Sequence, residues 1–374
     1  MKTLRVFFAI LGLFVLIGIF IVACFVFFMD PNRLKPVLVD EVMKKTGYRL
    51  EIEGDLSWSL YPRFGVHIAH MTFTQVNQAV PFLDLRDVNI ATALSRIWQS
   101  SQILQGEVYI SYARFVNLHA QEVRLTLNWQ NQVLTLQPLV ARLYNGMLKG
   151  TIHVYELPKS PRWDTDLKFN HVDIQSLLQD LRGSDNKISV SGWADGDLHL
   201  STQGTNREQI LNNLNGMAAY RVNQGALLGI DCNYWVQSAD ALVSGQSLAA
   251  LTNTKQTSFD QLTGNFIVKN GEVNHHFILA SSHFTVQGEG NLNLINETID
   301  DQLDIIPLNT SALKWTIPVL IEGPLRDPTI RLDMLKLKAM ITQEQIEKVK
   351  TKVQKEIKKL PEQADKLLKN IFGN

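Results

Sequence analysis

The chain has 374 residues, 45% of them hydrophobic, and 36 basic residues balance 36 acidic ones, so the formal net charge is zero. A chain without excess positive charge lacks the attraction that drives nucleic-acid binding, so we expect no nucleic-acid partner. The two cysteines, Cys24 and Cys232, are too few for a disulfide framework and do not indicate a redox compartment.

The chain begins with a long apolar run. From Val6 to Phe28 no side chain is charged, and about 20 such residues suffice to cross a bilayer core as a helix. Residues 1–29 are therefore predicted to form a transmembrane signal anchor. A cleaved signal peptide is less favoured because no small-residue cleavage site follows, and the lipobox-like Ile21–Cys24 is followed by bulky residues. Basic residues flank both ends of the run, so charge leaves its orientation open.

A short helix and then strands are predicted after the anchor. Asp30 and Pro31 are typical of a helix start and Gly47 of a helix end. The apolar face of this helix is expected to consist of Leu34, Leu38, Val42 and Met43. Beyond it, every second residue is apolar within 56–60, 64–68 and 71–73, which is typical of half-buried strands.

The strand pattern continues to residue 332 with few interruptions. Short helices are predicted at 93–102, 174–181 and 207–214, whereas 227–243 is ambiguous because its spacing fits a helix and its glycines do not. Asp195-Gly196-Asp197 is interpreted as a turn between strands. With about 15 strands and little helix between them, antiparallel pairing of consecutive strands is expected.

The tail, residues 333–374, differs from the rest. Apolar residues recur at steps of three and four from Ile346 to Ile371, which predicts an amphipathic helix of about 30 residues. Three roles remain open for it: covering the apolar face of the sheet, binding a membrane through its lysines, or pairing as a coiled coil.

The sequence contains no motif of a known catalytic or cofactor site. Neither a G-x-S-x-G elbow nor a G-x-x-x-x-G-K-[ST] phosphate loop occurs. His67 and His70 are expected on opposite faces of a strand, and His275-His276 in solvent, so neither pair predicts a metal site. We expect no enzymatic activity, no catalytic residue, no metal and no cofactor.

Two stretches of the chain resemble the AsmA family of bacterial envelope proteins. The first runs from Asp30-Pro31-Asn32 through Thr46-Gly47-Tyr48 to Gly54-Asp55-Leu56-Ser57-Trp58 and Tyr61-Pro62. The second includes Leu214-Asn215-Gly216, Asn223-Gln224-Gly225-Ala226, Phe259–Phe266, Val286–Gly290 and Ile321-Glu322-Gly323-Pro324. Between them, residues 75–200 are compatible in pattern only.

The resemblance implies a location and a function. It implies a single span in the bacterial inner membrane with the bulk of the chain in the periplasm, which would settle the orientation. It further implies kinship with chorein-type, bridge-like lipid transfer proteins, in which a curled sheet holds acyl chains. The implied partners are the inner-membrane bilayer and phospholipid, with envelope proteins as further candidates.

Together these observations predict a mainly β (α+β) fold: a transmembrane helix, an elongated curled antiparallel sheet forming an apolar trough, and a C-terminal amphipathic helix. The expected domains are 30–245, an AsmA-like β domain with short helices, 246–332, an AsmA-like meander, and the tail 333–374. The predicted lining of the trough is Trp58, Leu60, Phe64, Val66, Ile68, Phe73, Phe284, Val286, Leu292 and Leu294.

Two alternatives stay open. Alternation by itself is equally well explained by a sandwich or barrel whose core is filled by its own side chains. In function, the alternative to lipid transport or outer-membrane biogenesis is a structural or assembly factor for outer-membrane proteins that carries no lipid.

Overall fold

The computed structural model describes residues 30–59, 65–75, 78–91, 104–131, 133–156, 160–182, 188–237, 252–308, 316–333 and 335–336. Within these ranges no helix is long and apolar enough to span a membrane. The predicted anchor Val6–Phe28, the predicted helix 93–102 and the predicted tail helix lie outside the described residues, so all three stay predictions.

The first described elements form the predicted short helix. A 3-10 turn, η1 (Pro31–Arg33), leads into α2 (Leu34–Thr46), and Gly47 ends the helix in the left-handed conformation at φ 71°. Asp30 caps the turn, since its Oδ1 accepts a hydrogen bond from the backbone N–H of Asn32 at 2.9 Å. Both predicted ends of the helix are confirmed.

Two residues of the predicted apolar face of α2, Leu38 and Met43, are 38% and 39% exposed. The helical segment instead contacts strand β1 (Tyr48–Ser59) through polar groups. Lys35 Nζ donates to the carbonyl of Gly54 at 2.6 Å, and Asn32 Oδ1 accepts from the amide of Leu56 at 3.0 Å. These bonds occupy backbone groups at the edge of the sheet, which would otherwise be open to pairing with another chain.

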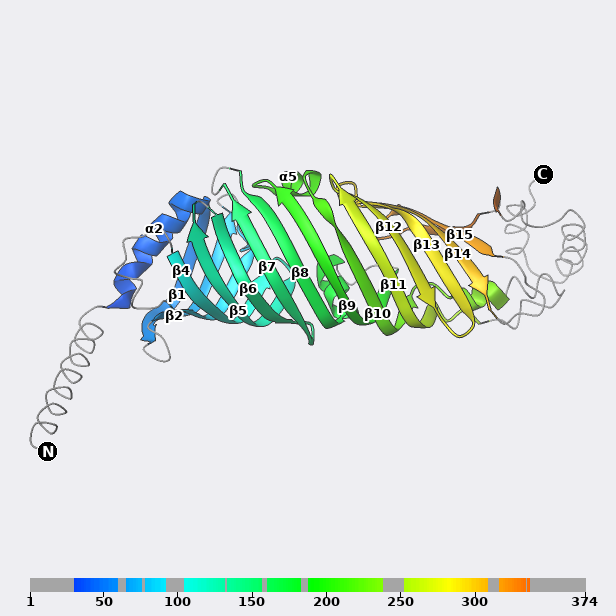
Figure 1. Cartoon of the computed structure of the whole chain (residues 1–374), viewed down its shortest axis with the longest axis horizontal. Helices are drawn as coiled ribbons and strands as arrows, with labels where there is room; N and C mark the ends of the chain where they lie inside the picture. The colour runs from blue at the N-terminus through cyan, green and yellow to red at the C-terminus, as the bar shows by residue number, and fades with distance from the viewer. Residues whose placement is uncertain are drawn as a thin grey trace, which may run out of the picture. The chain divides into compact units, whose positions relative to one another are not determined.

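Sixteen strands form one open sheet whose hydrogen-bonded order is the order of the sequence, from β1 to β16 (Figure 1). The pairs with a defined register are all antiparallel, as expected. After β1 the strands are β2 (Gly65–Gln75), β3 (Leu83–Ala91), β4 (Leu104–Phe115), β5 (Leu118–Gln130), β6 (Val133–Leu143), β7 (Gly146–Tyr155), β8 (Arg162–Asp173), β9 (Ser189–Gln203), β10 (Asn215–Leu228), β11 (Gln256–Lys269), β12 (Glu272–Ala280), β13 (Phe284–Asn293), β14 (Thr298–Pro307), β15 (Ile317–Pro324) and β16 (Thr329–Leu332).

The chain divides into two compact units at Leu139–Val140, within β6. Unit 1 contains α2 and β1 to β5, and unit 2 contains β7 to β16. The domain boundary predicted near residue 245 lies in 238–251, outside the described residues.

The short helices of unit 2 lie between strands. α4 (Ile174–Arg182) follows β8 and α5 (Arg207–Asn212) follows β9, and both were predicted. The ambiguous stretch from 227 resolves into the end of β10 and a helical turn at 232–237. Asp195-Gly196-Asp197 is not a turn but the middle of β9, where Asp195 accepts hydrogen bonds from Asn170 and from the amide of His171.

The alternation of the strands is interrupted by a kink, which we call the crease. In β3 the buried residues Leu85 and Val88 are three apart, and Asp87 between them has φ 50°. In β2 the buried pair Ile68 and Met71 shows the same step. A left-handed residue or a bulge bends a strand and moves the following side chains to the other face.

The crease recurs in both units. Residues with positive φ interrupt β5 at Glu122, β8 at His171 and β10 at Gln224, and the register shifts there between β8 and β9 and between β9 and β10. In β11 the buried Phe259 and Leu262 are again three apart. This three-residue spacing occurs at paired positions on neighbouring strands. The apolar side chains of these strands therefore stay together on one face of the sheet.

The side chains next to the crease form the deepest part of each unit, which we call the deep row. In unit 1 five directly paired residues, all buried, make it up: Leu56, Ile68, Val88, Ile110 and Val123. In unit 2 exposure in the deep row ranges from 0% at Val172 to 7% at Leu262, and the row comprises Val172, Ala194, Val222, Leu262, Leu279, Val286, Ile305 and Ile317.

Candidate functional site

The apolar face of unit 1 is buried only in part. Beside its deep row runs a second row of paired apolar residues that are half-buried or exposed: Trp58, Val66, Ile90, Val108 and Leu125. Ile90, in the middle of this row, is 41% exposed. Unit 1 therefore presents an apolar strip that its own described side chains do not fill.

The apolar face of unit 2 has two zones. In the closed zone, β12 to β16, side chains such as Phe284, Leu303 and Val319 are almost fully buried. They form one core with Ile230, Cys232 and Val236 from the segment after β10, and with buried side chains of β9 to β11. In the open zone, β7 to β11, the deep row is buried, but several side chains beside it on the same face are only half-buried: Leu148, Leu167, Phe169, Leu198, Leu200, Tyr220 and Phe266.

Aromatic rings on this face lie over glycines of the adjacent strand. A Cβ added to Gly196 would stand 2.6 Å from Phe169 Cζ, and one added to Gly264 would stand 2.5 Å from the Tyr220 hydroxyl oxygen. Phe277 covers Gly288 in the same way. Because glycine has no side chain, each ring can lie against the backbone of the adjacent strand, and the face is flatter at these positions.

One pair of polar side chains interrupts the apolar face. His275 on β12 and Asp301 on β14 both pair with Gly290 of β13, and His275 Nε2 lies 2.8 Å from Asp301 Oδ1 above that glycine. The two side chains are only 9% and 6% exposed. Phe277 stacks on the imidazole with the ring planes 5° apart.

Burial, with a smaller contribution from the charge of Asp301, raises the pKa of Tyr220 to about 12.

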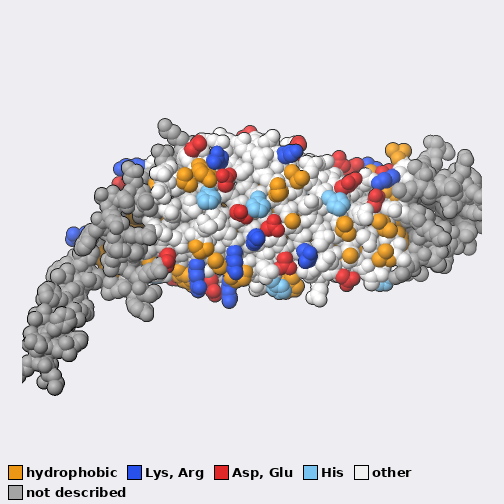
Figure 2. All heavy atoms as spheres, in the orientation of Figure 1, with side chains coloured by type: hydrophobic (Ala, Val, Ile, Leu, Met, Phe, Trp, Pro, Cys, Tyr) orange, Lys and Arg blue, Asp and Glu red, His pale blue; other side chains and the backbone are white. Residues whose placement is uncertain are grey.

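The opposite face of the sheet is polar. Figure 2, in the orientation of Figure 1, shows charged and histidine side chains spread over the strands, with hydrophobic ones in small separate groups. This contrast between the two faces is what the alternation of the sequence predicts.

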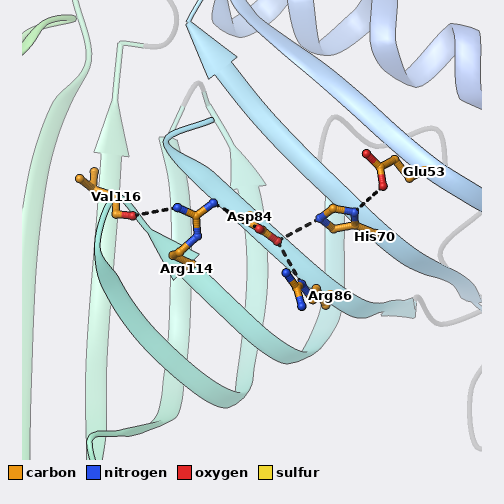
Figure 3. Close-up of polar contacts among 6 residues, drawn as sticks. All are labelled: Glu53, His70, Asp84, Arg86, Arg114 and Val116. Carbon is orange, nitrogen blue, oxygen red and sulfur yellow. Dashed lines mark hydrogen bonds and ion pairs between the residues drawn. The ribbon is translucent and has the colours of Figure 1, made fainter. Parts of the chain in front are cut away.

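The polar face of unit 1 contains a network centred on Asp84 (Figure 3). Asp84 accepts from His70 Nε2 at 3.0 Å and from Arg114 Nη2 at 3.3 Å, and Arg86 Nε lies 3.6 Å away. On its other side His70 bonds Glu53 at 2.9 Å. The network links four strands, β1 to β4, and all its ionised groups have opposite-charge neighbours.

The network shifts two pKa values. The hydrogen bond with Glu53 contributes most to raising the pKa of His70, and Asp84 adds to it against the opposing effect of burial. Burial alone would raise the pKa of Asp84, but the hydrogen bonds from Arg114 and His70 outweigh it and lower that pKa. His67 bonds Asn89 rather than the partners of His70. The described residues contain no group of three or more side chains suited to hold a metal ion.

The ten residues predicted to line the trough fall into four groups. Leu60 and Phe64 lie outside the described residues. Trp58, Val66, Ile68 and Phe73 share the apolar face of unit 1, where Trp58 pairs with Val66. Phe284 and Val286 belong to the closed core of unit 2, and Leu292 is half-buried beside it. Leu294 lies in the turn after β13. Whether any of them contacts lipid stays a prediction.

Sequence reasoning missed the buried polar pair. It assigned His275 and His276 to solvent, and that is wrong for His275, although His276 is exposed. Asp301 and Gly290 were not singled out at all. The available signal was Gly288-Glu289-Gly290, two glycines that share one face of a strand and so indicate large side chains on its neighbours.

The fold and the face together define a class: a β-sheet protein with sequential antiparallel strands, one polar face and one apolar face left partly uncovered. Comparison with protein families narrows this further. The AsmA family model matches residues 1–101 and 92–278, and the chain therefore belongs to the AsmA family. No curated protein and no solved structure gives a significant match.

Proposed function

We propose that the protein binds acyl chains of phospholipids on the apolar face of its sheet and takes part in lipid transport or outer-membrane biogenesis in the cell envelope. The observation that carries this proposal is the set of half-buried apolar side chains in the open zone and in the strip of unit 1. Membership in the AsmA family supports a role in the envelope or with lipids.

The energetics favour such a ligand. Apolar area removed from water contributes about 25 cal/mol per Å², so an acyl chain laid on a half-buried apolar row adds burial for both partners. A chain that leaves a bilayer exchanges one apolar environment for another, and each methylene group keeps its roughly 0.8 kcal/mol of burial. Transfer of this kind breaks no covalent bond, so the proposed role is not enzymatic and requires no cofactor.

The proposed location is the cell inner membrane, with residues 1–29 as a single span and the bulk of the chain in the periplasm. The charge-free run Val6–Phe28 and the family membership support this location. In this arrangement α2 follows the membrane span directly, which brings unit 1 next to the lipid source. The proposed partners are the inner-membrane bilayer, phospholipid and other envelope proteins.

Mass spectrometry of the purified full-length protein tests the proposal. Phospholipid should be recovered from it above the level of a control membrane protein with a single span. Leu198→Asp places a charge on the apolar face of β9 and should lower the recovered lipid several-fold. The matched control is Met217→Asp, on the polar face of the adjacent strand, where Met217 is 58% exposed.

Two outcomes would count against lipid binding. One is recovery of no more phospholipid than the control protein carries. The other is an equal effect of the two substitutions, since charge on the polar face should not disturb a lipid held on the opposite one. Retention of function in cells by the Leu198→Asp variant, together with protein partners on cross-linking, would favour an assembly factor that carries no lipid.

A further inference from the structure

Beside the deep row, side chains on the apolar face of unit 2 change from half-buried to buried beyond β12, and the change coincides with a buried pair of hydrogen-bonded polar side chains. Before β12, in the open zone, Leu198 and Phe266, which both pair with Ala218 of β10, are half-buried. After it, Leu303, Val319 and Ile321 are buried at 3%, 1% and 5% exposure. His275 and Asp301 lie at the boundary between the two zones.

We infer that the His275–Asp301 pair ends the acyl-binding part of the face, so that a lipid chain bound along β7 to β11 stops at β12. This inference rests on the proposed lipid binding and adds where the bound chain ends. The ligand it concerns is a hydrocarbon chain, and the pair acts as a positioning element rather than a contact that attracts the ligand.

The geometry fits a stop better than a stabilising contact. The two side chains meet over Gly290, and a Cβ at that position would overlap Asp301 Oδ1, so the fold leaves room for the pair. Replacing both partners of a buried polar pair by apolar side chains of similar shape is often neutral or stabilising, so stability does not account for its presence. A hydrocarbon chain laid across it would strip the remaining water from the carboxylate and gain no hydrogen bond in return.

Surface beyond the pair could accept a chain if the pair were absent. Leu292 on β13 and Ile299 on β14 lie on the same face, one paired row further along the strands than Gly290, and both are half-buried. The closed core therefore does not by itself exclude a chain from this row. The open zone spans five strands, and at about 4.8 Å per strand spacing its length is roughly 19 Å, which suits a single extended acyl chain.

Site-specific photocrosslinking in the full-length protein tests the inference. Benzoylphenylalanine is introduced at Leu198 or at Leu292, and the protein is loaded with phospholipid carrying a radiolabelled acyl chain. With the native pair, crosslinking is expected at position 198 and at least five-fold less at 292. In the double variant His275→Leu, Asp301→Leu, crosslinking at 292 should rise to the level seen at 198.

Each result bears on one proposal. Equal crosslinking at 198 and 292 with the native pair, or no rise at 292 in the double variant, overturns the inference while lipid binding stands. Failure to crosslink at 198 in every variant overturns the proposed function itself.

A thiol assay shows that the variants are folded. Cys232 is fully buried, and burial raises its pKa to about 11, so it should resist alkylation in a Cys24→Ser background as long as the core of unit 2 is intact. A double variant that gains crosslinking at 292 and still protects Cys232 supports the stop. One that exposes Cys232 is replaced by His275→Gln, Asp301→Asn, which keeps a hydrogen bond and should leave 292 uncrosslinked.

Discussion

The ring of Phe277 lies on Gly288 of the neighbouring strand, close enough that a β-carbon at 288 would overlap the ring and stand 2.9 Å from Leu303 Cδ2. This relationship depends on the absence of a side chain. Since the contacts involve side chains rather than backbone, they can be tested without disturbing the strand pairing.

Gly288→Ala should destabilise unit 2 by about 1–3 kcal/mol, because the methyl group forces Phe277 out of its position in a packed face. The measurement is urea unfolding of the full-length protein in detergent, followed by tryptophan fluorescence. Phe277→Leu should restore much of the loss in the double variant. Gly106→Ala, whose nearest neighbour is the Ala91 carbonyl oxygen at 3.3 Å, should change the midpoint little. An unchanged midpoint for Gly288→Ala would contradict the contact.

The crease can be tested at Gln224, which has φ 49° within β10. Gln224→Gly should be neutral or stabilising by up to about 1 kcal/mol, since glycine adopts this backbone conformation without a steric penalty. Gln224→Val should destabilise by more than that, because β-branched residues tolerate positive φ poorly. Both are measured by thermal unfolding, and equal effects of the two substitutions would mean that β10 does not kink there.

The Asp84 network predicts a pH dependence of stability. The pKa of His70 is raised above its ordinary value of 6.5, so its contribution is complete below pH 6.5 and is lost as the pH rises through the folded pKa. The pKa of Asp84 is lowered below 3.8, so its contribution is complete above pH 3.8 and is lost as the pH falls through the folded pKa. The network should therefore stabilise unit 1 most between pH 3.8 and pH 6.5.

His70→Gln tests this window. The difference in unfolding midpoint between wild type and variant should be largest near pH 5 and shrink as the pH rises above 6.5 and the wild-type imidazole loses its proton. His67→Gln is the control on the same strand, because His67 bonds Asn89 and no carboxylate in the network. A difference that stays constant from pH 5 to pH 8.5 would show that the charge of His70 contributes nothing.

The buried pair predicts a non-additive double-mutant cycle. His275→Leu alone leaves the Asp301 carboxylate buried without its partner, which should cost about 3–5 kcal/mol. The double variant His275→Leu, Asp301→Leu should be close to wild type in stability, because two apolar side chains can pack on this face. Chemical unfolding of the four proteins measures the coupling. Effects that simply add would argue against a direct interaction.

Much of the fold could be predicted because local signals agree with the final structure. Gly47 ends a helix as expected, the helices at 174–182 and 207–212 occur where amphipathic spacing placed them, and about the expected number of strands pair in chain order. Period-two alternation suffices for this, since each strand needs only to be recognised and paired with its successor.

The crease could not be predicted from the same signals. Asp87, Glu122 and Gln224 adopt positive φ inside strands, yet none is a glycine or part of a turn-forming pair. The kink keeps buried residues that are three apart, such as Leu85 and Val88 or Phe259 and Leu262, on one face of the sheet. This arrangement depends on the register of the neighbouring strands, which no window along one strand contains.

The candidate site was predicted in kind but not in extent. The apolar face was expected, whereas its core also contains Ile230, Cys232 and Val236 from the segment after β10, which join buried side chains of β9 to β15. The pairing of His275 with Asp301 depends on register across an intervening strand. Neither can be derived from spacing along the sequence.

Because each strand pairs with the strands that precede and follow it in the chain, a polypeptide of this design can begin to assemble while its remainder is still being synthesised. Contacts that close over short stretches of sequence form quickly and at low entropic cost. Adding or deleting one hairpin would lengthen or shorten the sheet and leave the other pairings unchanged, much as repeats do in solenoid proteins. Evolution can thus adjust the reach of such a molecule in steps of two strands.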